Sequence, residues 1–208
     1  MENVRLEQIK KDFRGGKQQQ FIGFWGNHND TPEEVTFSNF QKCYFDYDVN
    51  LDTPLRSVNK VRFSSSEQFF MYKKAVHFKD FDSVSRMLES GYKPYQYKKL
   101  GRQVKNYNDE EWSKVRYNYM LEALRLKYGQ NKDLLNILLN TGDAILVEAS
   151  PFDRLWGVGL AKYTKYGDKQ SDWKNPLKWK GDNLLGLALM QVREEFNEMR
   201  GNLNEEDI

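Results

Sequence analysis

An aspartate and a tryptophan three residues apart, Asp153 and Trp156, run directly into Gly157 and Gly159. Pro151 excludes a regular helix or strand interior here, and the glycines permit backbone conformations that other residues resist. We therefore expect a tight loop that presents the two side chains together. A carboxylate beside an indole suits a sugar joined to a flat base, because the acid takes a hydroxyl group or a proton and the ring stacks. The alternative is a surface turn with a capping aspartate and a half-buried tryptophan.

A second chemical feature is a pair of charged residues on an apolar helix face. Glu67 and Lys74 share that face, at helical spacing, with Phe70, Met71 and Phe78. Charges on a buried stripe are costly unless they are paired or used. A carboxyl group in a partly apolar pocket can protonate a leaving base, and a desolvated lysine becomes a nucleophile towards a sugar aldehyde. The alternatives are that Glu67 completes a capping box with Ser64 as N-cap, and that Lys74 extends its ammonium group to water.

Mainly helices are expected to position these groups. The patterns predict helices over 64–78, 82–90, 108–129, 132–140 and 183–199, and a short one after Pro94. Short strands are expected over 21–25, 35–37 and 58–63. The predicted fold is mainly α with a small β portion (α+β), in one compact domain. We expect a flexible N-terminal arm over 1–20, the catalytic domain over 21–199 with a polar insert at 162–182, and an acidic tail over 200–208.

Composition limits the cofactors and the compartment. The 208 residues include one cysteine, Cys43, and two histidines, so we expect no disulfide, no metal and no cofactor. No apolar run approaches the ~20 residues that span a bilayer. Because the charged N-terminal residues also lack a signal-peptide core, we expect a cytoplasmic protein without a membrane partner. The net charge of +2 does not demand a nucleic-acid partner, and the sequence gives no oligomeric state.

Two segments, 92–107 and 162–180, interleave basic and aromatic residues. Positive charge for phosphates and rings for bases is the pattern of single-stranded nucleic-acid binders. The alternative for each segment is a solvated, lysine-rich surface. At Asn183, the amides of the helix that follows could hold a phosphate, and the alternative is an ordinary N-cap.

Several motifs together resemble the NADAR superfamily, also called YbiA-like. They are, in order, FSNF at 37–40, SSSEQFFMYKKA at 64–75, LGR at 100–102 followed by Trp112, MLEALRLKYGQN at 120–131, LLNTG at 138–142, LVE at 146–148, DRLWGVG at 153–159 and WKGDNLLGLALMQVR at 179–193. Their joint order and spacing, over about residues 21–196, are specific. The resemblance implies a compact, mainly helical fold and cleavage of N-glycosidic bonds. Two activities are associated with such proteins: removal of ADP-ribose from guanine bases, and hydrolysis of early phosphoribosyl intermediates of riboflavin synthesis.

The resemblance also implies roles for individual residues. Glu67 is expected as general acid and base, Lys74 as the lysine that forms a Schiff base, and Asp153 as the group that orients a ribose hydroxyl or activates water. The residues expected to bind substrate are Asn39, Phe40, Gln68, Lys98, Arg102, Trp112, Trp156, Gly157, Asn183 and Arg193. The family usually has histidine where this chain has Gln68, which weakens any mechanism that needs an imidazole there. An amide can still bond a phosphate or a hydroxyl group.

Three functions remain open at this point. The leading hypothesis is an N-glycosidase that removes ADP-ribose from guanine, with an ADP-ribosylated guanine nucleotide or single-stranded DNA as substrate. The first alternative is hydrolysis of a small phosphoribosyl metabolite, which needs no nucleic-acid surface, so the basic aromatic segments argue mildly against it. The second is a module that binds ADP-ribose or NAD without turnover. The presence of Glu67, Lys74 and Asp153 argues against that module, because a protein that only binds ADP-ribose does not need a lysine on a buried helix face.

Overall fold

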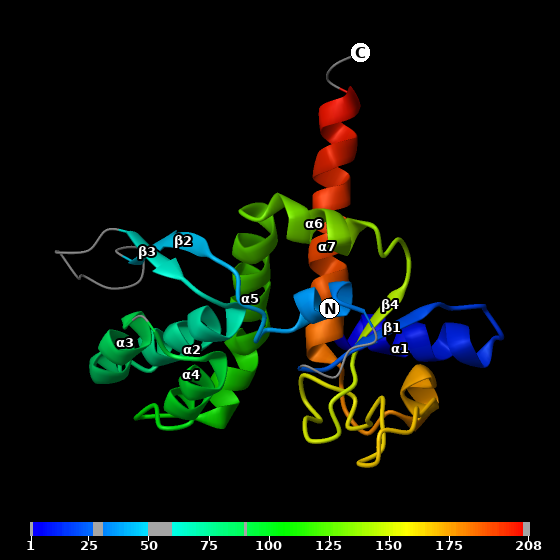
Figure 1. Ribbon diagram of the computed structural model, residues 1–208, viewed down its shortest axis with the longest axis horizontal. Coiled ribbons are helices and arrows are strands. Elements are labelled where there is room, and N and C mark those ends of the chain that lie inside the picture. Colours follow the sequence, from blue (N-terminus) through cyan, green and yellow to red (C-terminus); the bar gives the residue numbers. More distant parts are fainter. Residues whose placement is uncertain (1, 27–30, 50–59, 90, 206–208) are drawn as a thin grey trace. The chain divides into compact units, whose positions relative to one another are not determined.

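The computed structural model describes residues 2–26, 31–49, 60–89 and 91–205. By their internal contacts the residues form two compact units: the first unit is 1–38 with 136–208, and the second unit is 39–135. Helices dominate both, and among the described residues each has a small two-stranded sheet (Figure 1). The predicted fold class, mainly α with a small β portion, is confirmed. None of the helices in the described ranges combines the length and the hydropathy that a bilayer crossing requires.

The second unit is built around helix α2 (Ser66–His77), which is buried on almost every side. Helices α3 (Phe81–Leu88), α4 (Pro94–Gly101) and α5 (Asp109–Gly129) pack against it (Figure 1). Strands β2 (Phe45–Asp48) and β3 (Lys60–Phe63) form an antiparallel pair. The two strands contribute rings to an aromatic cluster with α2, made of Phe45, Tyr47, Phe63, Phe69 and Tyr72. This cluster supports α2 from the side of the sheet.

Two parallel strands form the centre of the first unit. Strand β1 (Phe21–Phe24) pairs with β4 (Ile145–Glu148), with Phe24 opposite Glu148. Helix α7 (Leu184–Glu205) packs on β4, and helix α1 (Glu2–Arg14) packs on α7. Short 3₁₀ helices complete the unit: η1 (Glu33–Phe37), η3 (Asp172–Lys174) and η4 (Pro176–Lys178). Because the strands are parallel, the loops that follow them leave from the same edge of the sheet.

The core of the first unit explains one glycine in β1. Val147, Ala149, Val158 and Trp173 form a buried cluster beside the sheet. A Cβ atom at Gly23 would lie 2.6 Å from the Trp173 ring, so only glycine lets the ring lie flat on the strand.

Most predicted elements are present with ends shifted by a few residues, and helix α6 (Lys132–Leu139) is among them. The strand predicted at 35–37 is wrong: those residues belong to η1, whose first turn follows Pro32 with φ −58°. The predicted strand 58–63 is observed as β3, and its first two residues lie outside the described ranges. Strands β2 and β4 were not predicted as strands.

Both ends of the chain are more helical than expected. The stretch predicted as a flexible arm contains α1, because Leu6 and Ile9, one turn apart, are both buried. Helix α7 continues to Glu205, well past the predicted end at 199, so most of the predicted acidic tail is helical. Residues 206–208 lie outside the described ranges, and the domain boundaries at 21 and 199 stay a prediction.

Candidate functional site

The start of helix α2 fixes the position of Glu67. Ser65, with extended backbone, is the N-cap, and its Oγ accepts a hydrogen bond from Gln68 N at 3.2 Å. The Gln68 Oε1 atom accepts bonds from the backbone N and the Oγ of Ser64, both at 2.8 Å. The predicted capping box of Ser64 and Glu67 is therefore wrong by one residue, and Gln68 has the capping role. Glu67, which is 5% exposed, therefore does not cap the helix.

Gln68 itself is a structural link. Its Nε2 donates to Met87 O at 2.8 Å, so the side chain joins the start of α2 to the end of α3. The side chain is 2% exposed. These contacts give its predicted role in substrate binding no support.

Asn39 lies directly against Glu67. The backbone O of Asn39 accepts a bond from Glu67 N at 3.1 Å. Its side chain is buried, and Nδ2 donates only to the weak acceptor Met120 Sδ at 3.4 Å. Among the described residues no donor reaches the buried Oδ1. Leaving such an acceptor unsatisfied costs about 1–3 kcal/mol, so the atom is suited to receive a hydroxyl or amide donor from a ligand.

An aromatic ring and a cation lie close together at the next residue of the chain. Phe40, which follows Asn39, is 37% exposed, and Lys98 Nζ lies 5.7 Å from the centroid of its ring. Arg102, one turn after Lys98 at the end of α4, is exposed. Asn39 thus contacts Glu67 through its backbone, and Phe40 contacts Lys98; their roles in catalysis and substrate binding stay a prediction.

Lys74 is held in a partly apolar pocket by α4 and α5. Its Nζ donates to Gly101 O at 2.9 Å and lies 4.0 Å from the centroid of the Tyr107 ring. Burial lowers the pKa of Lys74, and the charge of Asp109 opposes that shift only in part. A Cβ atom on Gly101 would collide with Met71 Sδ, so glycine permits the close approach of α4 that brings this carbonyl to Lys74.

Trp112 forms the wall behind Lys74. Its ring is 5% exposed and packs against Phe70 at 5.3 Å, Phe78 at 6.1 Å and Tyr119 at 5.7 Å between centroids. Lys74 Nζ lies 6.0 Å from the same ring. The structure therefore supports a role in desolvating Lys74, and gives no support to the predicted stacking of Trp112 on a ligand.

In the first unit, Asp153 organises its own loop. Its Oδ1 accepts bonds from Leu155 N at 3.0 Å and Trp156 N at 2.8 Å. The capping turn that was the alternative for Asp153 is thus present. The other carboxylate oxygen, Oδ2, has no hydrogen bond to the part of the chain that the structure describes. Trp156 is half-buried in the same loop.

The loop closes the start of helix α7. Backbone N atoms of Asp182, Asn183, Leu184 and Leu185 donate to the carbonyl oxygens of Arg154, Gly157, Leu155 and Trp156 at 3.0–3.3 Å. The amides of Leu184 and Leu185, in the first turn of the helix, are therefore already bonded, which gives the predicted phosphate site no support.

Asn183 is a structural residue rather than a ligand contact. It has φ 55°, in the left-handed region that asparagine tolerates better than most residues. Its Oδ1 accepts from Glu148 N at 3.0 Å and its Nδ2 donates to Leu146 O at 2.9 Å. The fully buried side chain thereby pairs with the edge of β4 as a neighbouring strand would.

Gly157 and Glu148 meet where the loop returns to the sheet. Val158 N donates to Glu148 O at 3.0 Å, and a Cβ atom at Gly157 would lie 2.8 Å from that oxygen. Gly157 is therefore required for close approach. Glu148 is buried at the carboxyl end of β4, and the sequence analysis did not assign it to the site. The available signal was an acid that ends an apolar run.

Arg193 is an internal anchor. Its Nη1 donates to Thr141 Oγ1 at 2.7 Å and Ala144 O at 2.9 Å, and burial lowers the pKa of the guanidinium group. These bonds fix the turn before β4. The predicted contact of Arg193 with a diphosphate has no support.

Some basic and aromatic residues of the segments 92–107 and 162–180 are internal, while others, such as Lys99 and Tyr166, are exposed. Lys162 is buried and donates to Gly23 O at 2.6 Å and Glu34 Oε2 at 2.7 Å. Trp179 Nε1 donates to Trp173 O, and Tyr97 is fully buried with its hydroxyl group on Glu89 O. The spacing that suggested nucleic-acid binding serves packing at these positions.

The sequence analysis also missed two buried lysines of the second unit. Lys127 in α5 is completely buried, and burial lowers its pKa to about 8. Lys73 in α2 is 5% exposed, with its Nζ 3.0 Å from Glu122 Oε2. The available signal for Lys127 was its helical spacing from the apolar residues Met120 and Leu124.

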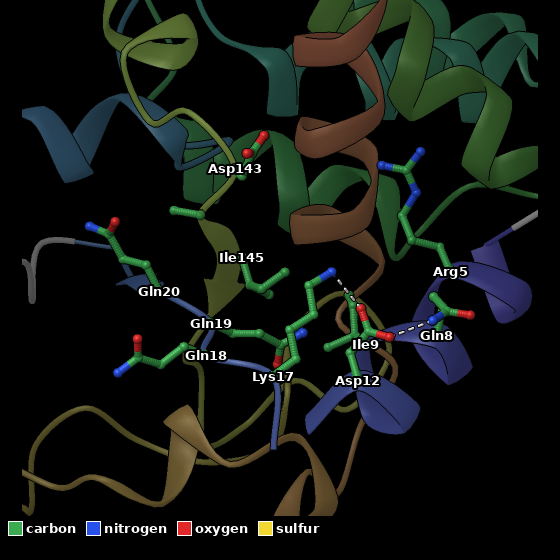
Figure 2. Close-up of a pocket in the computed structure, with 11 residues that line it drawn as sticks. Arg5, Gln8, Ile9, Asp12, Lys17, Gln18, Gln19, Gln20, Asp143 and Ile145 are labelled. Carbon is green, nitrogen blue, oxygen red and sulfur yellow. Dashed lines mark hydrogen bonds and ion pairs between the residues drawn. The ribbon is translucent and has the colours of Figure 1, made fainter. Parts of the chain in front are cut away.

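A cavity of about 590 Å³ lies at the opposite end of the sheet from the Asp153 loop (Figure 2). It sits where β1 and β4 begin, and its lining includes Arg5, Asp12 and Lys17. Lys17 is paired with Asp12, and Arg5 with Glu194. None of the predicted site residues lines it. In the described part of the chain no group of three His, Cys, Asp or Glu side chains is placed to hold a metal ion.

Comparison with known proteins places these features in a family. The family model described as the NADAR domain matches residues 23–197. N-glycosidase R617 of Acanthamoeba polyphaga mimivirus is 38% identical over 149 residues, which are 72% of this chain and 84% of that protein. The chloroplastic riboflavin biosynthesis protein PYRR of Zea mays is 33% identical over 86 residues, which are 41% of this chain and 11% of that protein. The NMR structure of the E. coli protein YbiA matches with a TM-score of 0.62 and 26% identity, over 88% of each chain.

Proposed function

Because this chain belongs to the NADAR family, we propose that it hydrolyses the N-glycosidic bond between ADP-ribose and guanine in nucleic acid. The family relationship confirms the resemblance predicted from the motifs. It also carries the coarser statement that the chain is a hydrolase of N-glycosyl bonds, the activity for which its mimiviral relative is named.

The observation that carries the proposal is that helix α2 bears both a buried carboxyl group, Glu67, and a lysine whose pKa is lowered, Lys74. Glu67 and Lys74 are seven residues apart, which is two helical turns and about 10 Å of axial rise. They therefore face the same side of α2. Glu67 is 5% exposed and has no capping role, while burial lowers the pKa of Lys74.

In the first step Glu67 acts as general acid. It transfers its proton to the departing guanine as the bond from the ribose anomeric carbon to the base nitrogen breaks, and the bonding electrons leave with the base. Glu67 is 5% exposed, and a buried carboxyl group within reach of the leaving base can serve as general acid. The unsatisfied Asn39 Oδ1, next to Glu67, is placed to accept a hydrogen bond from the substrate.

In the second step the neutral amine of Lys74 adds to the anomeric carbon of the ribosyl cation and loses a proton. The bond from that carbon to the ring oxygen then breaks, the oxygen takes up the proton, and the opened ribose is held as a Schiff base. Water then adds to the carbon–nitrogen double bond, and the amine leaves as the sugar aldehyde forms. The lowered pKa of Lys74 raises the fraction of neutral amine near neutral pH. Asp153 orients a ribose hydroxyl group through Oδ2, and Lys98 and Arg102 supply positive charge for phosphate groups.

A second candidate is hydrolysis of a small phosphoribosyl metabolite. The observation that favours it is the internal position of Lys162, Trp173 and Tyr97, which withdraws these three side chains of the basic aromatic segments from a nucleic-acid surface. The partial match to a riboflavin biosynthesis protein agrees with this candidate.

Product analysis by mass separates the two. Purified protein is offered an oligonucleotide that carries ADP-ribosyl-guanine and, separately, the phosphoribosyl intermediates of riboflavin synthesis. We expect release of ADP-ribose from the oligonucleotide, reduced roughly 10²- to 10⁴-fold in Glu67→Gln. Borohydride should trap a covalent adduct on Lys74.

The controls use exposed residues of the same unit. Glu110→Gln and Lys99→Ala should keep full activity, since both side chains are exposed. Undiminished release in Glu67→Gln or Lys74→Ala would refute the assigned roles, and turnover of the riboflavin intermediates alone would favour the second candidate. Binding of ADP-ribose without hydrolysis of either substrate would indicate a non-catalytic ADP-ribose-binding module.

A further inference from the structure

We propose that Phe152 and Trp25 form a platform on which a purine ring of the substrate stacks. The proposal rests on the proposed function, because it names a part of the substrate that the first unit recognises. It adds two residues to which the motifs assigned no role.

The topology brings the two rings to one edge. Trp25 directly follows β1, and Phe152 lies in the segment that follows β4. The parallel pairing continues past the strands, because Ala149 N donates to Phe24 O at 2.9 Å. Both rings therefore leave the sheet at its carboxyl end, which is the end where parallel strands of open α/β sheets present ligand sites.

The ring of Phe152 is available for a ligand. It is 87% exposed, more than the other large hydrophobic side chains of the described residues. Its only ring contact in this part of the molecule is with Trp25, at 6.0 Å between centroids and 54° between planes. Because burial of apolar surface is favourable, a flat ligand that covers this ring would gain binding free energy.

The loop fixes the backbone at Phe152. Ser150 Oγ accepts from Phe152 N at 3.4 Å, and the next residue, Asp153, fixes the following turn through its Oδ1. Phe152 is thus displayed by an ordered segment, one residue from a carboxylate oxygen that the loop leaves available.

The chemistry selects a flat, uncharged group. Two rings beside each other offer a π surface and no cation, so a base is favoured over a phosphate group. ADP-ribosyl-guanine contains two purines, adenine and guanine, and either of these flat bases can stack on the two rings. Asp153, the residue after Phe152, then lies beside the sugar that is attached to the stacked base.

The test compares Phe152→Ala, Phe152→Trp and a control, Tyr166→Ala. Tyr166 is also a highly exposed aromatic residue of the first unit, at 80%, but it lies in the 162–182 insert. Loss of one stacked base costs about 1–3 kcal/mol, so KM of Phe152→Ala should rise roughly 5- to 150-fold with kcat within about twofold. Phe152→Trp should restore KM, and Tyr166→Ala should match the wild type.

Binding of ADP-ribose by calorimetry, on the same proteins, separates the two proposals. If the wild type hydrolyses the oligonucleotide and Phe152→Ala has the same KM and affinity, the platform is refuted and the proposed function stands. If the wild type hydrolyses none of the substrates but Phe152→Ala alone loses affinity for ADP-ribose, the platform stands and the proposed function is wrong. Absence of both activity and binding in the wild type overturns both.

Discussion

Replacing Lys127 by methionine should remove a destabilisation of the fold that depends on pH. Lys127 is completely buried, and burial lowers its pKa from 10.5 to about 8. In the unfolded chain the amine has its ordinary pKa, so between pH 8 and 10.5 the unfolded state binds more protons than the folded state. The destabilisation is fully present below pH 8 and disappears as the pH rises to 10.5.

The magnitude follows from the two pKa values. One pKa unit is worth about 1.4 kcal/mol, so the difference between 10.5 and about 8 corresponds to about 3 kcal/mol. Methionine fills a similar volume without a charge. Lost contacts of the ammonium group, such as its approach to the Tyr128 ring at 5.2 Å, change the stability of the variant at every pH. The pH dependence of the difference in unfolding free energy between Lys127→Met and the wild type therefore isolates the protonation of Lys127.

Urea unfolding at pH 7 and pH 10.5 measures this difference, with Lys99→Met as a control because Lys99 is exposed. We expect the gap in unfolding free energy between Lys127→Met and the wild type to shift by about 3 kcal/mol between the two pH values. The control should show no such shift. Cys43 and Tyr128, whose pKa values burial raises, are present in all three proteins. A gap that is the same at both pH values would refute the reasoning and show that the folded protein keeps Lys127 charged.

Two further predictions concern the loop and the lysine of the site. Asn183→Ala should destabilise the first unit by about 2–4 kcal/mol, because it leaves the two buried backbone groups of β4 that the side chain bonds without a partner. Asn175→Ala, in a partly exposed turn, is the control. Equal urea midpoints for the two variants would contradict the structural role of Asn183. The activity of the wild type should rise with pH through a pKa below the ordinary lysine value of 10.5, since burial lowers the pKa of Lys74 and only its neutral amine attacks. A pH–rate profile whose alkaline rise is unchanged in a residually active Lys74→Arg variant would exclude Lys74 as the titrating group.

Local signals in the sequence were enough for most helices and for the face of α2 that carries Glu67 and Lys74. The apolar spacing of Phe70, Met71 and Phe78 places Glu67 and Lys74 on one side of α2, and Asn108 caps α5 as its residue type suggests. The error at the start of α2 is one residue, because three serines in a row offer alternative caps. That one residue decides whether Glu67 or Gln68 serves the helix.

Long-range pairing was beyond what the sequence could indicate. Strands β1 and β4 are parallel and more than one hundred residues apart in the chain, so no turn signal connects them. The same distance hides why Asn183 and Arg193 are polar: each satisfies backbone or side-chain groups of the 141–148 segment. A polar residue that bonds internally has the same sequence signature as one that bonds a ligand, and only the partner distinguishes them.

For Asp153, capping and chemistry are compatible roles. A carboxylate has two oxygens, and the turn uses one of them: Oδ1 receives the amides of Leu155 and Trp156. Two backbone donors on one oxygen fix the orientation of the group. The second oxygen, Oδ2, is left to accept a hydrogen bond. Asp153 is therefore suited to orient a hydroxyl group through Oδ2 while Oδ1 organises its own loop.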